Sequence, residues 1–143
     1  MNRQSAMLSK ANFEQLSEFR YQIRCFERFS ERAAKSQGIT PLQYLLLLHI
    51  KGFPTREWAS IGELATRLQA RHNAVVALVT RCEALGLVTR RGSETDGRTV
   101  EVHLSHLGEV ILARLAQMHR AELTSISESY LGLHAGIGTD RER

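Results

Sequence analysis

The chain has 143 residues, of which 43% are hydrophobic and 24% charged, and its formal net charge is +4. This length suits one domain, or one domain with appended helices, while the modest positive charge permits an anionic partner without requiring one. Apolar runs such as residues 44–48 are too short to cross a bilayer, and residues 1–15 lack the apolar segment of a signal peptide, so we expect a cytoplasmic protein without membrane contact.

Residues 9–37 contain no proline or glycine, and their apolar side chains recur at alternating spacings of three and four. This pattern predicts a long amphipathic helix with a heptad-like seam, which Gly38 would end as a left-handed cap. A helix this long in a short chain often packs against a partner chain, so residues 1–38 are interpreted as an N-terminal dimerisation region. The seam residues assigned to dimerisation are Leu16, Phe19, Ile23 and Phe26.

Three shorter helices are predicted next. The first has Thr40 as its cap and Pro41 in its first turn, and it stops at Gly52. The second opens with Ser60 and Glu63 in the spacing of a capping box. After a tight connection the third covers residues 70–85.

The helix over residues 70–85 is predicted to have a core face and an exposed face. The core face comprises Val75, Leu78, Val79, Cys82 and Leu85. The exposed face comprises Arg71, His72, Asn73, Val76, Ala77, Thr80 and Arg81.

Residues 87–91 and 99–104 are predicted to form a β-hairpin. In the second strand Val100, Val102 and Leu104 alternate with polar residues, which is typical of a strand with one buried face. Two short helices joined by a tight turn and followed by such a hairpin predict a winged helix-turn-helix, in which the second short helix enters the DNA major groove. We therefore expect a mainly α fold with a small β-hairpin wing over residues 39–104, flanked by long N- and C-terminal helices.

Residues 105–143 are interpreted as a C-terminal helix and tail. Ser105 can cap a helix that begins near His106, and Leu115 and Met118 are among its apolar positions. The final thirteen residues contain three glycines, so we expect the end to fray and the helix to be shortened.

Most of the net positive charge lies in the predicted helix-turn-helix and wing. Residues 67–98 hold six arginines against three acidic residues, which supplies +3 of the total +4. Arginine suits bidentate contacts to phosphate and guanine, while Asn73 and His72 can hydrogen-bond base edges and Val76 can touch a thymine methyl. Arg67 is expected to help with phosphates. The predicted DNA-binding residues are Arg71, His72, Asn73, Val76, Arg81, Arg90, Arg91, Asp96 and Arg98.

The segments "SIGELATRL", "VVALVTRCEALGLVTRR", "DGR" and "LSHLG" together resemble the MarR (multiple antibiotic resistance regulator) family of bacterial transcription factors. The resemblance implies an obligate homodimer, formed by the first and last helices, that binds pseudo-palindromic operators. It thereby implies that residues 105–143 are a C-terminal dimerisation helix and tail, with Leu115 and Met118 on the dimer-forming side. Because the C-terminal part is short and glycine-rich, more of the dimer contact would fall on the first helix and on the helix from His106.

The resemblance also implies a repressor that a small aromatic ligand releases. The family's wing motif falls on Asp96 and Arg98, which implies that Arg98 enters the minor groove while Asp96 holds it. The stretch "HNAVVA" departs from the family, where Ser or Thr often stands.

A separate feature is the recurrence of arginine every four residues on the first helix, which could line a site for an anionic ligand or form a solvated stripe; the residues are Arg20, Arg24, Arg28 and Arg32.

Two other functions of the same fold stay open. The two cysteines form no C-x-x-C motif or disulfide framework, so we expect reduced thiols. Cys25 or Cys82 could then make the protein a thiol-based oxidant-sensing regulator, because some relatives sense oxidants through a cysteine of the first helix. Alternatively, the winged helix could be a protein-interaction module that does not bind DNA. For Arg90, the alternative to a phosphate contact is a solvated side chain. The sequence contains no motif that predicts an enzyme, and we expect neither a cofactor nor a metal.

Overall fold

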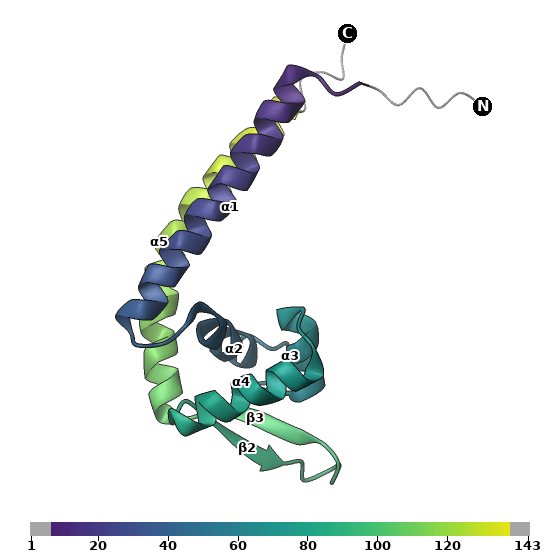
Figure 1. Cartoon of the computed structure of the whole chain (residues 1–143), viewed down its shortest axis with the longest axis vertical. Helices are drawn as coiled ribbons and strands as arrows, with labels where there is room; N and C mark the ends of the chain where they lie inside the picture. The colour runs from purple at the N-terminus through teal and green to yellow at the C-terminus, as the bar shows by residue number, and fades with distance from the viewer. Residues whose placement is uncertain (1–6, 138–143) are drawn as a thin grey trace, which may run out of the picture. The chain divides into compact units, whose positions relative to one another are not determined.

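The computed structural model describes residues 7–137 and divides into two compact units. One unit is Glu31–Met118, and the other combines the residues up to Ser30 with those from His119 onward. The elements in chain order are α1 (Lys10–Ser36), α2 (Pro41–Lys51), β1 (Trp58–Ser60), α3 (Ile61–Leu68), α4 (His72–Ala84), β2 (Val88–Gly92), β3 (Val100–Leu104) and α5 (His106–Ile137) (Figure 1). Within the described part, no helix combines the length and apolarity needed to cross a membrane.

The long first helix is confirmed, and its ends follow the local sequence. Before α1, the Ser9 hydroxyl accepts a hydrogen bond from the Asn12 N–H at 3.2 Å, and the Ser9 N–H donates to Asn12 Oδ1 at 2.9 Å. After α1, Gly38 adopts a φ of +75°, which is the left-handed conformation predicted for it.

The starts of α2 and α3 are fixed by capping boxes. Thr40 and Gln43 exchange reciprocal hydrogen bonds at the start of α2, and Ser60 and Glu63 do so at the start of α3. Each box satisfies two N–H groups that a helix leaves unpaired at its first turn. Gln69 then takes a left-handed φ of +51°, which ends α3 and forms the tight turn into α4.

The wing belongs to a three-stranded antiparallel sheet rather than to an isolated hairpin. The strand order is β1-β3-β2, and Ala59 of β1 faces Val102 of β3. The sequence prediction of two strands was therefore incomplete. A three-residue strand is too short to display alternation, and its partner lies more than forty residues later in the chain.

The core of the Glu31–Met118 unit lies between α2, α3, α4 and the sheet. Its largest fully buried side chains are Leu46, Leu47, Ile50, Leu64, Leu87, Leu115, Val75, Val79, Val88, Val102 and Cys82. Four of the five residues predicted for the core face of α4 are buried. The prediction for the fifth, Leu85, was wrong, because this C-cap residue is 50% exposed. α4 ends at Ala84, so Leu85 lies just beyond the helix whose core face was predicted.

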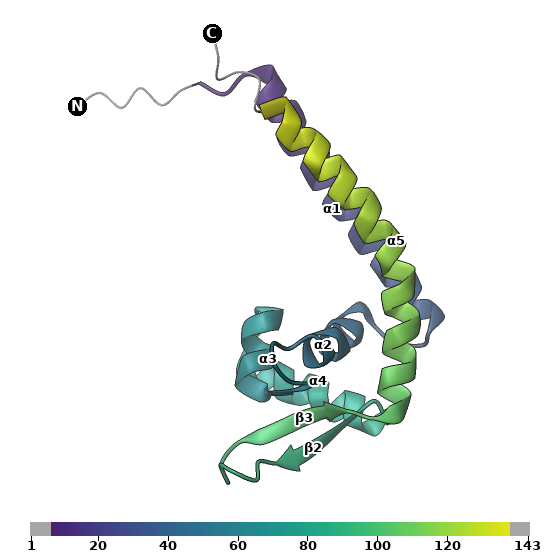
Figure 2. The same ribbon diagram turned by 180° about the vertical axis from the view of Figure 1, so that it is seen from behind.

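In the other unit, the parts of α1 and α5 outside Glu31–Met118 run antiparallel and side by side (Figures 1 and 2). The imidazole of His119 meets the rings of Phe26 and Phe29 edge-on, with centroids 5.8 and 5.3 Å away. His119 is buried, and its Nε2 lies 3.0 Å from Ser30 Oγ. This hydrogen bond gives the buried ring a polar partner, as burial requires.

The last helix is longer than the sequence predicted. α5 continues to Ile137, so Gly132 and Gly136 lie within it and the expected shortening over these residues was wrong. The rest of the predicted frayed tail, residues 138–143, lies outside the described residues. A glycine lowers helix stability by only about 1 kcal/mol, which is too little to break a long helix by itself.

Candidate nucleic-acid interface

The exposed face of α4 contains the predicted base-reading residues. Arg71, His72, Asn73, Val76 and Arg81 are all exposed, as predicted from the helical pattern. Arg71 occupies the N-cap position, but its side chain makes no capping hydrogen bond. The first backbone N–H groups of α4 therefore receive no hydrogen bond from the side chain at the N-cap position. A helix start of this kind favours the binding of anions.

The wing loop is organised by the carboxylate of Asp96. Asp96 Oδ1 accepts a hydrogen bond from the backbone N–H of Arg98 at 3.1 Å, and Oδ2 accepts one from the Thr99 hydroxyl at 2.9 Å. These two bonds lower the pKa of Asp96, the backbone bond contributing most. The loop closes further through Ser93, whose N–H donates to the carbonyl oxygen of Thr99 at 3.0 Å.

A cleft of about 320 Å³ lies where the wing, the start of α3 and the start of α4 meet. Its lining residues are Ser60, Ile61, Gly62, His72, Arg98, Thr99 and Val100. It therefore brings the predicted wing residue Arg98 to the same cleft as His72 at the start of α4. Their side chains could donate hydrogen bonds to an anion or to base edges from two sides.

Sequence reasoning did not include Ser60, Gly62 or Thr99 in the site. The capping-box pattern located Ser60 at a helix start, but its position beside the wing follows from the pairing of β1 with β3, in which Ser60 faces Glu101. For Thr99, the only sequence signal was its position at the start of the predicted second wing strand; in the structure it directly precedes β3.

Four of the predicted arginines are available to a partner. Within residues 7–137, the guanidinium groups of Arg71, Arg81, Arg91 and Arg98 are exposed and have no hydrogen-bond or ion-pair partner. Arg67, by contrast, lies over the ring of Phe53 at 5.6 Å from its centroid. The wing and α4 thus present unneutralised positive charge, while Arg67 is partly engaged.

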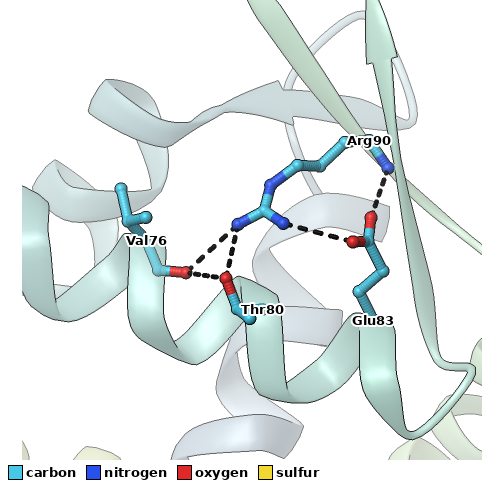
Figure 3. Close-up of polar contacts among 4 residues, drawn as sticks. All are labelled: Val76, Thr80, Glu83 and Arg90. Carbon is cyan, nitrogen blue, oxygen red and sulfur yellow. Dashed lines mark hydrogen bonds and ion pairs between the residues drawn. The ribbon is translucent and has the colours of Figure 1, made fainter.

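Arg90 differs from these arginines, because its guanidinium lies against α4 (Figure 3). Its Nη1 is 3.2 Å from Glu83 Oε1, and its Nη2 donates to Thr80 Oγ1 at 2.8 Å and to the Val76 carbonyl oxygen at 3.3 Å. The sequence assigned Arg90 to phosphate contact or to solvent. The structure instead gives it three partners on the helix.

The start of α3 is held by an aromatic cluster beside β1. The guanidinium carbon of Arg56 lies 3.7 Å from the centroid of the Trp58 ring and 4.5 Å from that of Phe53. Arg56 also forms an ion pair with Glu63, the residue that completes the capping box of α3. These contacts fix the edge of the cleft that Ser60 and Gly62 line.

The residues predicted for dimerisation differ in exposure. Leu16 is 55% exposed and Phe19 38% exposed, whereas Ile23 and Phe26 are half-buried. Met118 is 38% exposed, but Leu115 is fully buried within the single chain. Leu115 is therefore a core residue, and its assignment to a dimer surface is withdrawn.

The two cysteines lie in different surroundings. Cys82 is fully buried in the core face of α4, and burial raises the pKa of its thiol to about 11. Cys25 is half-buried on α1. Because the thiolate is the form that oxidants attack, Cys82 is poorly suited to sensing them.

Comparison with known proteins agrees with this arrangement. Residues 37–99 match the model of the MarR family. The chain is 32% identical over 98 residues to a putative transcriptional regulatory protein for the hcr operon of Thauera aromatica, covering 68% of this chain and 57% of that protein. It is 29% identical over 91 residues to the HTH-type transcriptional repressor MdtR of Bacillus subtilis, covering 60% and 57% of the two chains. The matched parts therefore span little more than half the length of these relatives.

The fold is also found in a solved structure. Sco3205 of Streptomyces coelicolor, a MarR family transcriptional regulator crystallised in complex with DNA, matches 97% of this chain and 92% of its own chain. The TM-score is 0.71 at 20% sequence identity, which demonstrates a shared fold. Residues 37–99 therefore resemble the winged helix-turn-helix region of the MarR family, and the fold of the chain is that of a solved MarR family regulator.

Proposed function

We propose that the protein is a sequence-specific DNA-binding regulator of transcription, and that it represses by occupying a pseudo-palindromic operator as a homodimer. The observation that carries the proposal is the meeting of Arg98 and His72 at one cleft, beside an α4 start without a side-chain cap. Support also comes from the relatives, which are named as a transcriptional regulator and a repressor. The solved structure of Sco3205 is named as a complex with DNA.

Each exposed residue has a distinct role in this proposal. Asn73, His72 and Val76 at the start of α4 contact base edges in the major groove. Arg71, Arg81 and Arg91 contact phosphates, which gives affinity that depends strongly on salt. Arg98 reaches the adjacent minor groove from the wing, and Asp96 fixes the loop that carries it.

The homodimer places two copies of α4 on the same face of the DNA. The exposed apolar side chains of α1, Leu16 and Phe19, pack against the second copy, and Ile23 and Phe26 extend this surface. Met118, in the Glu31–Met118 unit, makes a separate contact with the second copy. A two-fold axis then separates the two recognition helices by one turn of DNA, ~34 Å. A small aromatic or anionic effector acts by binding one spacing of these helices better than another.

Fluorescence anisotropy tests the proposal most directly. The intact protein is titrated against labelled DNA from upstream of its own gene and against a random duplex of equal length, each at two salt concentrations. The expected result is tight, salt-sensitive binding that is stronger on an inverted repeat than on random sequence. Equal and weak binding to several upstream and random duplexes would contradict sequence-specific regulation.

Two rival functions make different predictions in the same assay. For an oxidant sensor, Cys25 is the better candidate, since Cys82 is buried with a raised pKa. Peroxide would then abolish DNA binding in the parent protein but not in Cys25→Ser. For a protein-interaction module, no duplex would bind with a dependence on salt.

A further inference from the structure

Arg90 and Glu83 form the polar connection between the wing and α4. Glu83 uses both carboxylate oxygens on the same residue of β2: Oε2 accepts from the backbone N–H of Arg90 at 3.2 Å, and Oε1 accepts from its guanidinium at 3.2 Å. β2 is an edge strand, so this N–H faces away from the sheet and requires an acceptor outside it. Glu83 therefore holds both the backbone and the side chain of Arg90.

The other end of the same guanidinium holds the middle of α4. Arg90 Nη2 donates to the Thr80 hydroxyl, and that hydroxyl in turn donates to the Val76 carbonyl oxygen at 3.0 Å (Figure 3). The hydroxyl of Thr80 is consequently both an acceptor and a donor within the protein. From a single position in β2, the guanidinium therefore contacts both Val76 and Glu83 of α4.

An arginine engaged in this way is poorly placed to neutralise DNA. Its positive charge already faces the carboxylate of Glu83, and its side chain is only 30% exposed. The adjacent Arg91 provides the contrast within the same strand, because it is exposed and has no partner among the described residues.

We propose that Arg90 is a positioning residue that, with Glu83, locks the wing against the recognition helix and so sets where Arg98 lies relative to His72 and Asn73. This inference rests on the proposed function, since it concerns how the DNA-reading parts are aligned. A fixed alignment matters because phosphate and base contacts must be made simultaneously, and a displaced wing would lose the minor-groove contact while α4 stays bound.

Four variants separate a positioning role from a phosphate contact. Glu83→Gln removes a negative charge and places an amide NH2 group where Arg90 donates hydrogen bonds. Arg90→Lys keeps the positive charge but cannot reach all three acceptors on α4. Arg90→Gln removes the positive charge. Arg91→Gln is the matched control, with the same charge change one residue away. Each is measured by anisotropy on operator and random duplexes over a range of salt concentrations, and each fold is checked by thermal unfolding.

The positioning role predicts that Glu83→Gln and Arg90→Lys both weaken operator binding, by about tenfold for one lost interaction, with little change on random DNA. The slope of log K against log salt stays unchanged in the Arg90 variants, whereas Arg91→Gln reduces its magnitude by about 2, because the homodimer loses one phosphate contact in each subunit. A phosphate role predicts the reverse: tighter binding for Glu83→Gln, rescue by Arg90→Lys, and a reduced slope in Arg90→Gln. Either that pattern or unchanged operator binding in all Glu83 and Arg90 variants would overturn the proposal.

Hydrogen exchange in the free protein gives a readout that does not depend on DNA. Glu83→Gln is expected to speed exchange of the Arg90 amide and of the wing amides, but to leave the amides of α2 unchanged. Unchanged exchange at Arg90 would show that Glu83 does not hold the strand. The two proposals can also fail separately. If the parent protein bound no operator but Glu83→Gln still sped exchange of the Arg90 amide, the proposed DNA-binding function would be wrong, while the structural connection between the wing and α4 would be supported.

Discussion

The carboxylate of Asp96 accepts a hydrogen bond from the backbone N–H of Arg98, 3.1 Å away, and it makes no ion pair with the Arg98 guanidinium. The acidic residue of the wing motif therefore shapes the loop rather than neutralising its arginine. This leaves the full charge of Arg98 at the cleft that His72 also lines.

The first prediction concerns how these two residues act together. Arg98→Ala is expected to weaken operator binding by ~1–3 kcal/mol, because one groove contact is lost. Asp96→Ala should weaken it through the loop, so the double variant should lose less than the sum of the single ones. Anisotropy on the operator measures all three. Full additivity would show that Asp96 does not act through Arg98.

The second prediction is a dependence of the wing on acidic pH. The hydrogen bonds from the Arg98 N–H and the Thr99 hydroxyl lower the pKa of Asp96 in the folded protein. The stabilisation that they give is therefore complete above the ordinary pKa of Asp, ~3.9, and is lost as the pH falls through the lowered folded value. An NMR titration should follow the Asp96 carboxyl and the Arg98 amide together below that range. Titration at or above the ordinary Asp value would contradict the assigned contacts.

The third prediction concerns the junction between the wing and α5. A Cβ on Gly108 would clash with the carbonyl oxygen of Leu87, a backbone atom that also accepts the Ser105 N–H. Gly108→Ala should therefore destabilise the fold by ~1–3 kcal/mol, as overpacking does. Gly62→Ala is the control, since a Cβ there meets nothing within 4 Å. Thermal unfolding should separate the two, and equal melting temperatures would disprove the close approach.

The fourth prediction tests the dimer surface on α1. Leu16→Glu should dissociate the dimer, because the leucine is 55% exposed in the single chain and would be replaced by a charge that must be buried. Tyr21→Glu introduces the same charge on the opposite side of the helix, at a residue that is 61% exposed. Light scattering should find a monomer only for the first variant. A dimeric Leu16→Glu protein would place the interface elsewhere.

The fifth prediction concerns thiol reactivity. Burial raises the pKa of Cys82 to about 11, so at neutral pH its thiol is protonated as well as covered. Iodoacetamide should therefore leave Cys82 unmodified in the native protein and label it only after unfolding, while Cys25 provides the native-state comparison. Mass spectrometry of digested protein distinguishes the two sites. Rapid native labelling of Cys82 would reopen it as an oxidant sensor.

The sequence by itself determined most of the local structure. The spacing of apolar residues predicted the long first helix, and the Ser60 and Glu63 pair predicted the start of α3, because capping and amphipathic patterns depend on neighbours within one or two turns. The exposed face of α4 and the position of Arg98 in the wing were predictable for the same reason.

Only the tertiary structure decided which distant residues meet. The pairing of β1 with β3 brings Ser60 to the wing, the packing of β2 on α4 gives Arg90 its three partners, and the core encloses Leu115. None of these contacts has a short-range pattern, since each depends on how the chain is folded back across many residues. The physical reason is that a side chain's charge and shape are fixed by its own chemistry, whereas its partners are fixed by the packing of elements far apart in sequence.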